Sequence, residues 1–119
     1  MRKDEKFSFR WGVPILDKGT TTVPNFFFDS YIEAGATRTE FLAILHLARY
    51  QYETPNSECR PSVGVVAKQM GYYDRKGLQL VLAKMEKKGL LVKHFRTGQA
   101  TIYDFSGFSK KVLAINASR

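Results

Sequence analysis

The chain has 119 residues and a mass of 13.6 kDa, which allows one domain with one hydrophobic core and excludes two. Hydrophobic residues make up 44% of it, which argues against disorder, yet no apolar run approaches the roughly 20 residues of a membrane span. The formal net charge of +8 favours a polyanionic partner, either nucleic acid or an anionic membrane surface.

The N-terminal segment is predicted to be an arm with short strands. Met1–Trp11 has neither an apolar core nor a small-residue cleavage site, so a signal peptide is not expected. The N-terminal segment contains two β-type runs, Phe7–Leu16 and Thr20–Val23. Pro14 confines the first run to an edge strand or an irregular arm.

Two helices are predicted after the arm. Pro24 can begin the first helix and Gly35 ends it. Its apolar stripe consists of Phe27, Phe28, Tyr31 and Ile32. The second helix lies in "TRTEFLAILHLARYQY", where either Thr37 or Thr39 can provide the N-cap. Its apolar face consists of Phe41, Leu42, Ile44, Leu45 and Ala48.

A pair of helices joined by a tight turn comes next. The segment "ETPNSECRPS" is a loop by composition, and Ser62 caps a short helix that stops at Gly71. Asp74 is the N-cap of a longer helix, which Gly89 ends after a basic last turn.

After Gly89 the apolar residues alternate, which predicts a hairpin in "LLVKHFRTGQATIYDF" with Gly98 in a positive-φ turn at its tip. A short C-terminal amphipathic helix is expected to use Phe108, Val112, Leu113 and Ile115. The predicted fold class is therefore mainly α with a small β component. Helix, tight turn, helix and hairpin is the winged helix-turn-helix arrangement. Residues 1–22 are assigned to the arm and 23–119 to this domain.

The helix Asp74–Lys88 has two different faces. Residues spaced for burial are Leu78, Val81, Leu82 and Met85. Residues on the opposite face are Lys76, Gly77, Leu80, Ala83, Lys84 and Lys87. Gly77 and Leu80 are unusual against water, but Gly allows close approach of a DNA backbone and Leu can meet a thymine methyl. Alternatively, Leu80 packs under the C-terminal segment or a second subunit, and Gly77 is merely tolerated.

All the excess positive charge lies in the half of the chain that contains this helix. Arg60–Arg119 holds twelve Lys or Arg and three Asp or Glu, a net charge of +9, whereas residues 1–59 hold seven and eight, a net of −1. A generally solubilising surface would spread the charge over both halves. The distribution favours DNA as the partner. Lys87 and Lys88 can alternatively be explained by the helix dipole alone.

The stretch "RPSVGVVAKQMGYYDRKGLQLVLAKMEKKGLLVKHFRTGQATIYDFSGF" resembles the winged helix-turn-helix domain of bacterial and phage replication-initiation proteins, including DnaD-type primosomal proteins and plasmid or phage initiators. The resemblance covers roughly residues 20–108. It implies a recognition helix that opens with a small polar cap and two basic residues, here Asp74, Arg75 and Lys76. Gly77 and Leu80 depart from the polar or basic residues usual there, so phosphate binding is implied more firmly than sequence-specific reading.

The residues expected to contact DNA are Ser62, Lys68, Tyr72, Arg75, Lys76, Gln79, Lys84, Lys93, Arg96 and Gln99. Ser62 and Lys68 would meet phosphate at the start and along the short helix. Arg75, Lys76 and Gln79 would reach base edges.

The turn and the wing complete this expected surface. Tyr72 is predicted to be exposed, as a hydroxyl donor to phosphate, and Tyr73 to lie in the core. Lys93 is expected to face solvent near phosphate. Arg96 and Gln99 would enter the minor groove or touch the backbone, although Arg96 is alternatively an ordinary hairpin charge.

No motif for catalysis or for a cofactor is found. His46, His94 and Cys59 have no metal-site spacing, and the glycine-containing runs match neither a P-loop nor a dinucleotide turn. The single cysteine excludes an internal disulfide and suits a cytoplasmic location. We therefore expect neither an enzyme nor a protein that binds a metal, a small-molecule substrate or a membrane.

The leading hypothesis is a protein that binds double-stranded DNA during replication initiation. A second hypothesis is a protein-interaction or oligomerisation module, in which the aromatic arm with Phe7, Phe9 and Trp11 pairs with another copy to form a homodimer. A third is a transcription regulator of the same fold.

Overall fold

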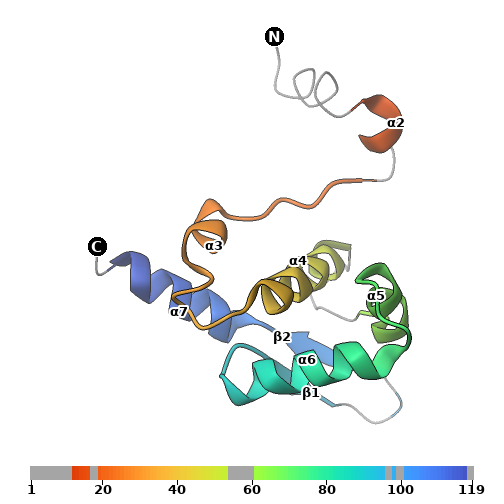
Figure 1. Cartoon of the computed structure of the whole chain (residues 1–119). Coiled ribbons are helices and arrows are strands. Elements are labelled where there is room, and N and C mark those ends of the chain that lie inside the picture. The colour runs from red at the N-terminus through yellow and green to blue at the C-terminus, as the bar shows by residue number, and fades with distance from the viewer. Residues whose placement is uncertain (1–11, 17–18, 54–60, 96–97, 99–100, 118–119) are drawn as a thin grey trace.

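The described residues form a mainly helical fold with one small antiparallel sheet (Figure 1). The computed structural model describes residues 12–16, 19–53, 61–95, 98 and 101–117. The helices are α2 (Val13–Leu16), α3 (Asn25–Ser30), α4 (Arg38–Glu53), α5 (Val63–Gln69), α6 (Arg75–Lys87) and α7 (Ser106–Ala117). The strands are β1 (Val92–His94) and β2 (Ile102–Asp104), with Lys93 opposite Tyr103. The predicted class, mainly α with a small β component, is confirmed.

The arm differs from the prediction of short strands. Val13–Leu16, within the run predicted to be β, is a helix, and Thr20–Val23 forms no strand. Pro14 fits the first turn of a helix because the amide hydrogen that it lacks has no intrahelical partner there. The part of the predicted run that precedes Gly12 lies outside the described residues. Figure 1 shows α2 standing apart from the other helices, on an extended connection.

The helix boundaries follow the local signals in the sequence. Thr37 caps α4, and the cap residue of α6 is Asp74, as predicted. Gly35, Gly71 and Gly89 all have positive φ angles, of 100°, 89° and 75°. Each glycine follows a helix or a helical turn, and this backbone conformation costs glycine little.

The core joins α4, α5 and α6 to the hairpin and α7. Side chains less than 2% exposed include Ile44, Val66, Leu82, Met85, Leu90, Leu91, Phe108 and Val112. The predicted core stripe of α6 is confirmed, since Leu78 is also buried and Val81 is half-buried. Four predicted core residues are wrong: Phe28, Ile32, Leu42 and Leu113 are exposed. They lie on the outer sides of their helices and turns, where the other described elements leave them 43–63% exposed.

Gly107 allows the start of α7 to approach the end of α6. A Cβ atom built on Gly107 would overlap the carbonyl oxygen of Gly89 and lie 3.4 Å from its carbonyl carbon. Phe108, the next residue, is fully buried and contacts the ring of Phe27 edge-on, with centroids 4.9 Å apart. The first turn of α7 is therefore held against both the α6–β1 connection and α3.

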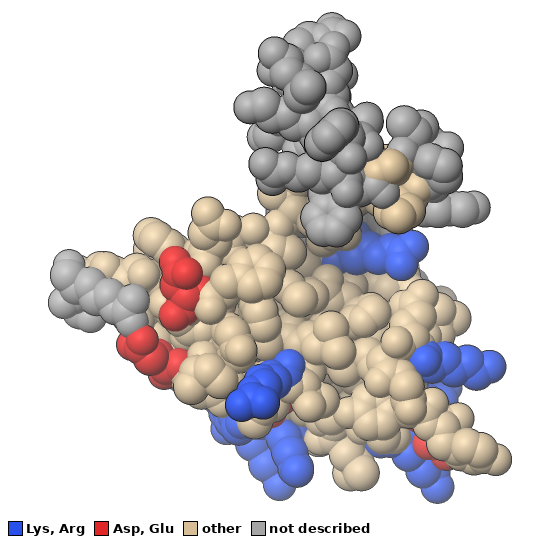
Figure 2. All heavy atoms as spheres, turned by 45° about the horizontal axis from the view of Figure 1, so that its top comes forward, with Lys and Arg blue, Asp and Glu red and all other residues tan. Residues whose placement is uncertain are grey.

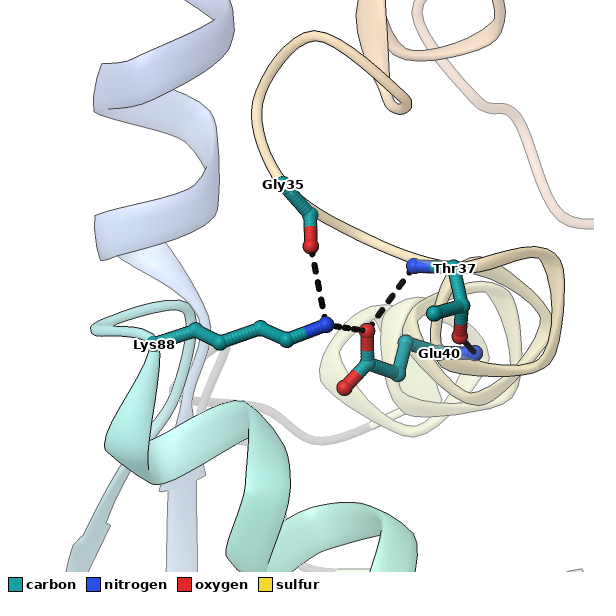
Figure 3. A network of polar contacts seen from close by, with 4 residues as sticks. All are labelled: Gly35, Thr37, Glu40 and Lys88. Carbon is teal, nitrogen blue, oxygen red and sulfur yellow. Dashed lines mark hydrogen bonds and ion pairs between the residues drawn. The ribbon is translucent and has the colours of Figure 1, made fainter.

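A buried carboxylate connects the start of α4 to the end of α6 (Figure 3). Glu40 and Thr37 form a capping box, in which Glu40 Oε1 accepts the Thr37 amide at 2.8 Å and Thr37 Oγ1 accepts the Glu40 amide at 3.1 Å. Lys88 Nζ donates to Glu40 Oε1 at 2.6 Å and to the Gly35 carbonyl at 3.0 Å. Lys88 is thus bound to a specific acid and does not merely offset the helix dipole.

The Glu40–Lys88 pair makes stability depend on pH. Burial raises the pKa of Glu40, but the hydrogen bonds from Lys88 and Thr37 and the positive charge of Lys88 outweigh burial and lower that pKa below its usual 4.5. A carboxyl whose pKa is depressed by folding stabilises the fold above its unfolded pKa, and this stabilisation is lost as pH falls through the folded pKa.

We therefore expect Lys88→Met to lower the free energy of unfolding by about 1–2 kcal/mol at pH 7, because a buried carboxylate loses a charged donor that is itself partly exposed. The difference from wild type should shrink below about pH 4.5. Lys87→Met, on the exposed neighbour, is the control and should change stability little. Urea denaturation across this pH range checks both; an equal effect of the two substitutions would contradict the assignment.

Candidate nucleic-acid interface

The outward face of α6 is basic and partly apolar. Its exposed residues are Arg75, Lys76, Gln79, Leu80, Ala83, Lys84 and Lys87. Leu80 exposes 68% of its surface, so nothing in the described part of the chain packs over it. Glu86, at the edge of this face, has its carboxylate 3.0 Å from Lys93 Nζ. The central stripe therefore presents cations, an amide and a leucine, without an acid.

Asp74 fixes the first turn of α6. Its Oδ1 accepts the backbone amide of Lys76 at 3.0 Å, as expected of an N-cap. The carboxylate is thereby used for the cap, while the side chains of Arg75 and Lys76 remain exposed. The two cations that open the helix are thus set in a defined direction, away from the buried stripe.

Arg75 lies between two hollows in the surface. One, of about 320 Å³, is lined by Pro61, Ser62, Val63, Gly64, Arg75, Thr101 and Tyr103. The other, of about 400 Å³, is lined by Ser62, Gly64, Val65, Lys68, Tyr73, Asp74 and Arg75. The first reaches β2, and the second reaches the turn between α5 and α6. Arg75 therefore stands where three elements meet: the start of α5, the start of α6 and the hairpin.

Ser62 and Lys68, the residues expected on α5, are both exposed beside Arg75. Ser62 occupies the N-cap position of α5, but its side chain makes no capping hydrogen bond. The prediction that Ser62 caps α5 is therefore correct for its position and wrong for its hydroxyl group, which does not bond to the backbone of the helix.

The two tyrosines of the turn are exchanged relative to the prediction. Tyr73, predicted to be in the core, is 99% exposed, whereas Tyr72, predicted to be exposed, is half-buried against the core. The sequence contained a signal for this, because Gly77 leaves room for a ring. A Cβ atom on Gly77 would lie 2.8 Å from Cγ of Tyr72 and even closer to Cδ1. Packing of Tyr72 therefore accounts for Gly77 without any DNA.

Lys93 was predicted to face solvent, but its side chain is mostly covered. It pairs with Glu86 at 3.0 Å, and its ammonium group lies 5.8 Å from the ring centroid of Tyr103. Its side chain is 20% exposed. These two contacts fix the start of the hairpin to α6, so Lys93 has a structural role that sequence spacing could not indicate.

The tip of the predicted wing is described at one position. Gly98 has φ of 71°, which agrees with the predicted positive-φ turn. Arg96 and Gln99, the two wing residues expected to contact DNA, lie outside the described residues.

The structure shows the surroundings of both histidines, His46 on α4 and His94 on β1. The part of the chain that the structure describes contains no group of three or more His, Cys, Asp or Glu side chains able to hold a metal ion. Burial lowers the pKa of His46, as does the charge of Arg49. His94 Nε2 lies 3.6 Å from Asp104 Oδ2, and the pKa of Asp104 is lowered chiefly by a hydrogen bond from the Ser106 amide. Cys59 is outside the described residues.

None of the described helices is both long enough and apolar enough to cross a membrane.

Comparison with known proteins assigns no family to this chain. No family model matches the sequence, and no curated protein matches it significantly.

Proposed function

We propose that this chain binds double-stranded DNA as a winged helix-turn-helix protein. In this proposal α4, α5 and α6 form the helical part, the β1–β2 hairpin is the wing, and α6 lies in the major groove. The observation that carries the proposal is the exposed stripe of α6, where four cations surround Gln79 and Leu80 without an intervening acid. Such a face would be unusual against water alone.

The chemistry of this stripe suits a DNA groove. Arg75 and Lys76 can donate to phosphates or to guanine edges, and Gln79 can pair with adenine. Leu80 can contact a thymine methyl group, because its side chain is exposed. Lys84 and Lys68 would then meet the flanking phosphates. Lys93, which pairs with Glu86, is removed from the set of expected DNA contacts. Gly77 is explained by the ring of Tyr72 that packs against it.

The proposed process is replication initiation. Its support is the resemblance of roughly residues 20–108 to the winged helix-turn-helix domain of bacterial and phage replication-initiation proteins. A transcription regulator of the same fold would differ by a strong preference for one short palindrome over random duplex. Site selection from a random duplex library distinguishes these two roles.

DNA binding is tested by fluorescence anisotropy with a labelled random duplex and with its single strand, at salt concentrations of about 50 to 300 mM. We expect tighter binding to the duplex than to the single strand. The logarithm of the binding constant, plotted against the logarithm of the salt concentration, should have a slope near −4 to −5, because about five phosphates would be neutralised. The proposal that α6 reads a groove would be contradicted if no binding occurred at the lowest salt concentration. It would also be contradicted if the duplex and the single strand bound with equal affinity.

A further inference from the structure

Gly64, in the first turn of α5, is a glycine that the fold itself does not require. Three glycines of the chain lack a positive φ angle, namely Gly64, Gly77 and Gly107. A Cβ atom on Gly77 would meet the ring of Tyr72, and one on Gly107 would meet the carbonyl oxygen of Gly89. A Cβ atom on Gly64 would meet nothing within 4 Å. Neither backbone conformation nor packing within the described part of the chain therefore explains this glycine, which is less favourable than alanine in a helix.

Gly64 borders both of the hollows that flank Arg75. The hollow of about 320 Å³ and the hollow of about 400 Å³ share Ser62, Gly64 and Arg75 in their linings, so they adjoin each other. A side chain at position 64 would stand in the open space that the glycine leaves. Glycine is common where the backbone of a ligand comes close to that of a protein. The missing side chain thus keeps the joined hollows open.

The smaller hollow carries groups that bind an anion. Arg75 supplies a guanidinium group, whose donors match the oxygens of a phosphate. Ser62 and Thr101 supply two hydroxyl groups, and that of Ser62 is not used to cap α5. None of the described residues that line this hollow is Asp or Glu. Its chemistry therefore suits a phosphate group.

The larger hollow has an apolar wall with cations beside it. Tyr73, which is 99% exposed, and Val65, which is 47% exposed, form the wall, and Lys68 and Arg75 supply the cations. Asp74 is the one acid among the described residues of this lining, and its Oδ1 already accepts a backbone amide as the cap of α6. A sugar ring can pack against such a wall while a cation holds the phosphate next to it.

The charges on this side of the molecule favour a polyanion. Neither Lys68 nor Arg75 is paired with an acid of the described residues. Figure 2 shows most Lys and Arg toward the lower and right-hand margins of the molecule, with acidic groups mainly on the left. Figure 1, a related view, places α5 at the right and α6 along the bottom. Unpaired cations beside a hollow attract a negatively charged ligand.

We propose that the two hollows hold the sugar–phosphate backbone of one DNA strand, beside the groove that α6 enters. This inference rests on the proposed DNA binding and assigns the contacts at its edge. One phosphate lies between Arg75, Ser62 and Thr101. The adjoining sugar packs on Tyr73, and Lys68 meets the next phosphate. Arg75 is thereby a backbone contact and not a reader of bases.

The test fills the hollows without changing the charge of the protein. Gly64→Leu should weaken binding of a labelled random duplex at least about tenfold at about 0.1 M salt, and the smaller Gly64→Ala about threefold, because the added side chains stand where the strand would lie. Fluorescence anisotropy measures both affinities. Urea denaturation should show both variants at least as stable as wild type, since leucine and alanine are better helix formers than glycine.

Ala114→Leu is the matched control, because it adds the same side chain to an exposed position of another helix, α7. It should bind the duplex like wild type. If wild type binds but Gly64→Leu binds equally well, the strand does not pass through the hollows, and the proposal is overturned while DNA binding stands. If Gly64→Leu does not fold, the same comparison with Gly64→Ala decides. An equal loss in the control also overturns the proposal, whereas a wild type that binds no duplex overturns the proposed function itself.

The role of Arg75 is tested by its dependence on base sequence. Arg75→Gln should weaken binding of an A·T-rich and of a G·C-rich duplex by the same factor, to within about twofold, because a phosphate is the same in every sequence. The logarithmic dependence of affinity on salt concentration should become shallower by about one. A loss confined to the G·C-rich duplex would mean that Arg75 reads guanine in the groove, and it would overturn the proposal.

Discussion

Replacing Arg75→Ala and Lys76→Ala together should weaken duplex binding at least about tenfold at 0.1 M salt, which is on the order of 1.4 kcal/mol. Both side chains are exposed, and the Asp74 cap uses only the backbone amide of Lys76, so the variant should fold like wild type. The log–log salt slope should become shallower by about one for each phosphate that the variant no longer neutralises. Anisotropy titrations with one labelled duplex measure both quantities.

The matched control removes the same charge from another helix. Lys110→Ala with Lys111→Ala on α7 also deletes two exposed cations, so it lowers the net charge equally. If α6 is the reading helix, this control should reduce affinity less than about threefold, because it acts only through the long-range field. Equal losses of affinity in the two variants would mean that the total charge matters and that α6 has no special position.

The element boundaries could be predicted from the sequence because their causes are local. Asp74 needs only the amide two residues later, and Gly71 and Gly89 need only a backbone conformation that other residues rarely adopt. The apolar spacing within α6 indicated its buried stripe for the same reason. The arm is the exception, since Val and Ile in "VPIL" favour strands and four residues are too few for a helical period to show.

Side-chain directions could not be predicted where the partner is distant or the turn is tight. Lys93 is drawn to Glu86 by the way the hairpin returns along α6, and Lys88 to Glu40 across 48 residues of sequence. Tyr72 and Tyr73 are adjacent, so one turn decides which is buried. For the candidate site, the exposed cations of α6 were therefore predictable, whereas the removal of Lys93 from it was not.

The largest loss of stability is expected from Gly107→Ala. The new Cβ atom would overlap the carbonyl oxygen of Gly89, which is a backbone atom and cannot rotate away as a side chain can. Separating α7 from the α6–β1 connection would also disturb Phe108, which is fully buried between them and α3. Overpacking of this kind costs about 3 kcal/mol, and the better helix propensity of Ala returns up to about 1 kcal/mol.

Gly64→Ala provides the matched control, because Gly64 is also helical and a Cβ atom there would meet nothing within 4 Å. It should raise stability slightly, through helix propensity and a less flexible unfolded chain. Urea denaturation of the three proteins should therefore place Gly107→Ala about 2 kcal/mol or more below wild type and Gly64→Ala at or above it. If Gly107→Ala were also neutral, α7 would not rest on Gly89, and the packing of the start of α7 against the α6–β1 connection would have to be different.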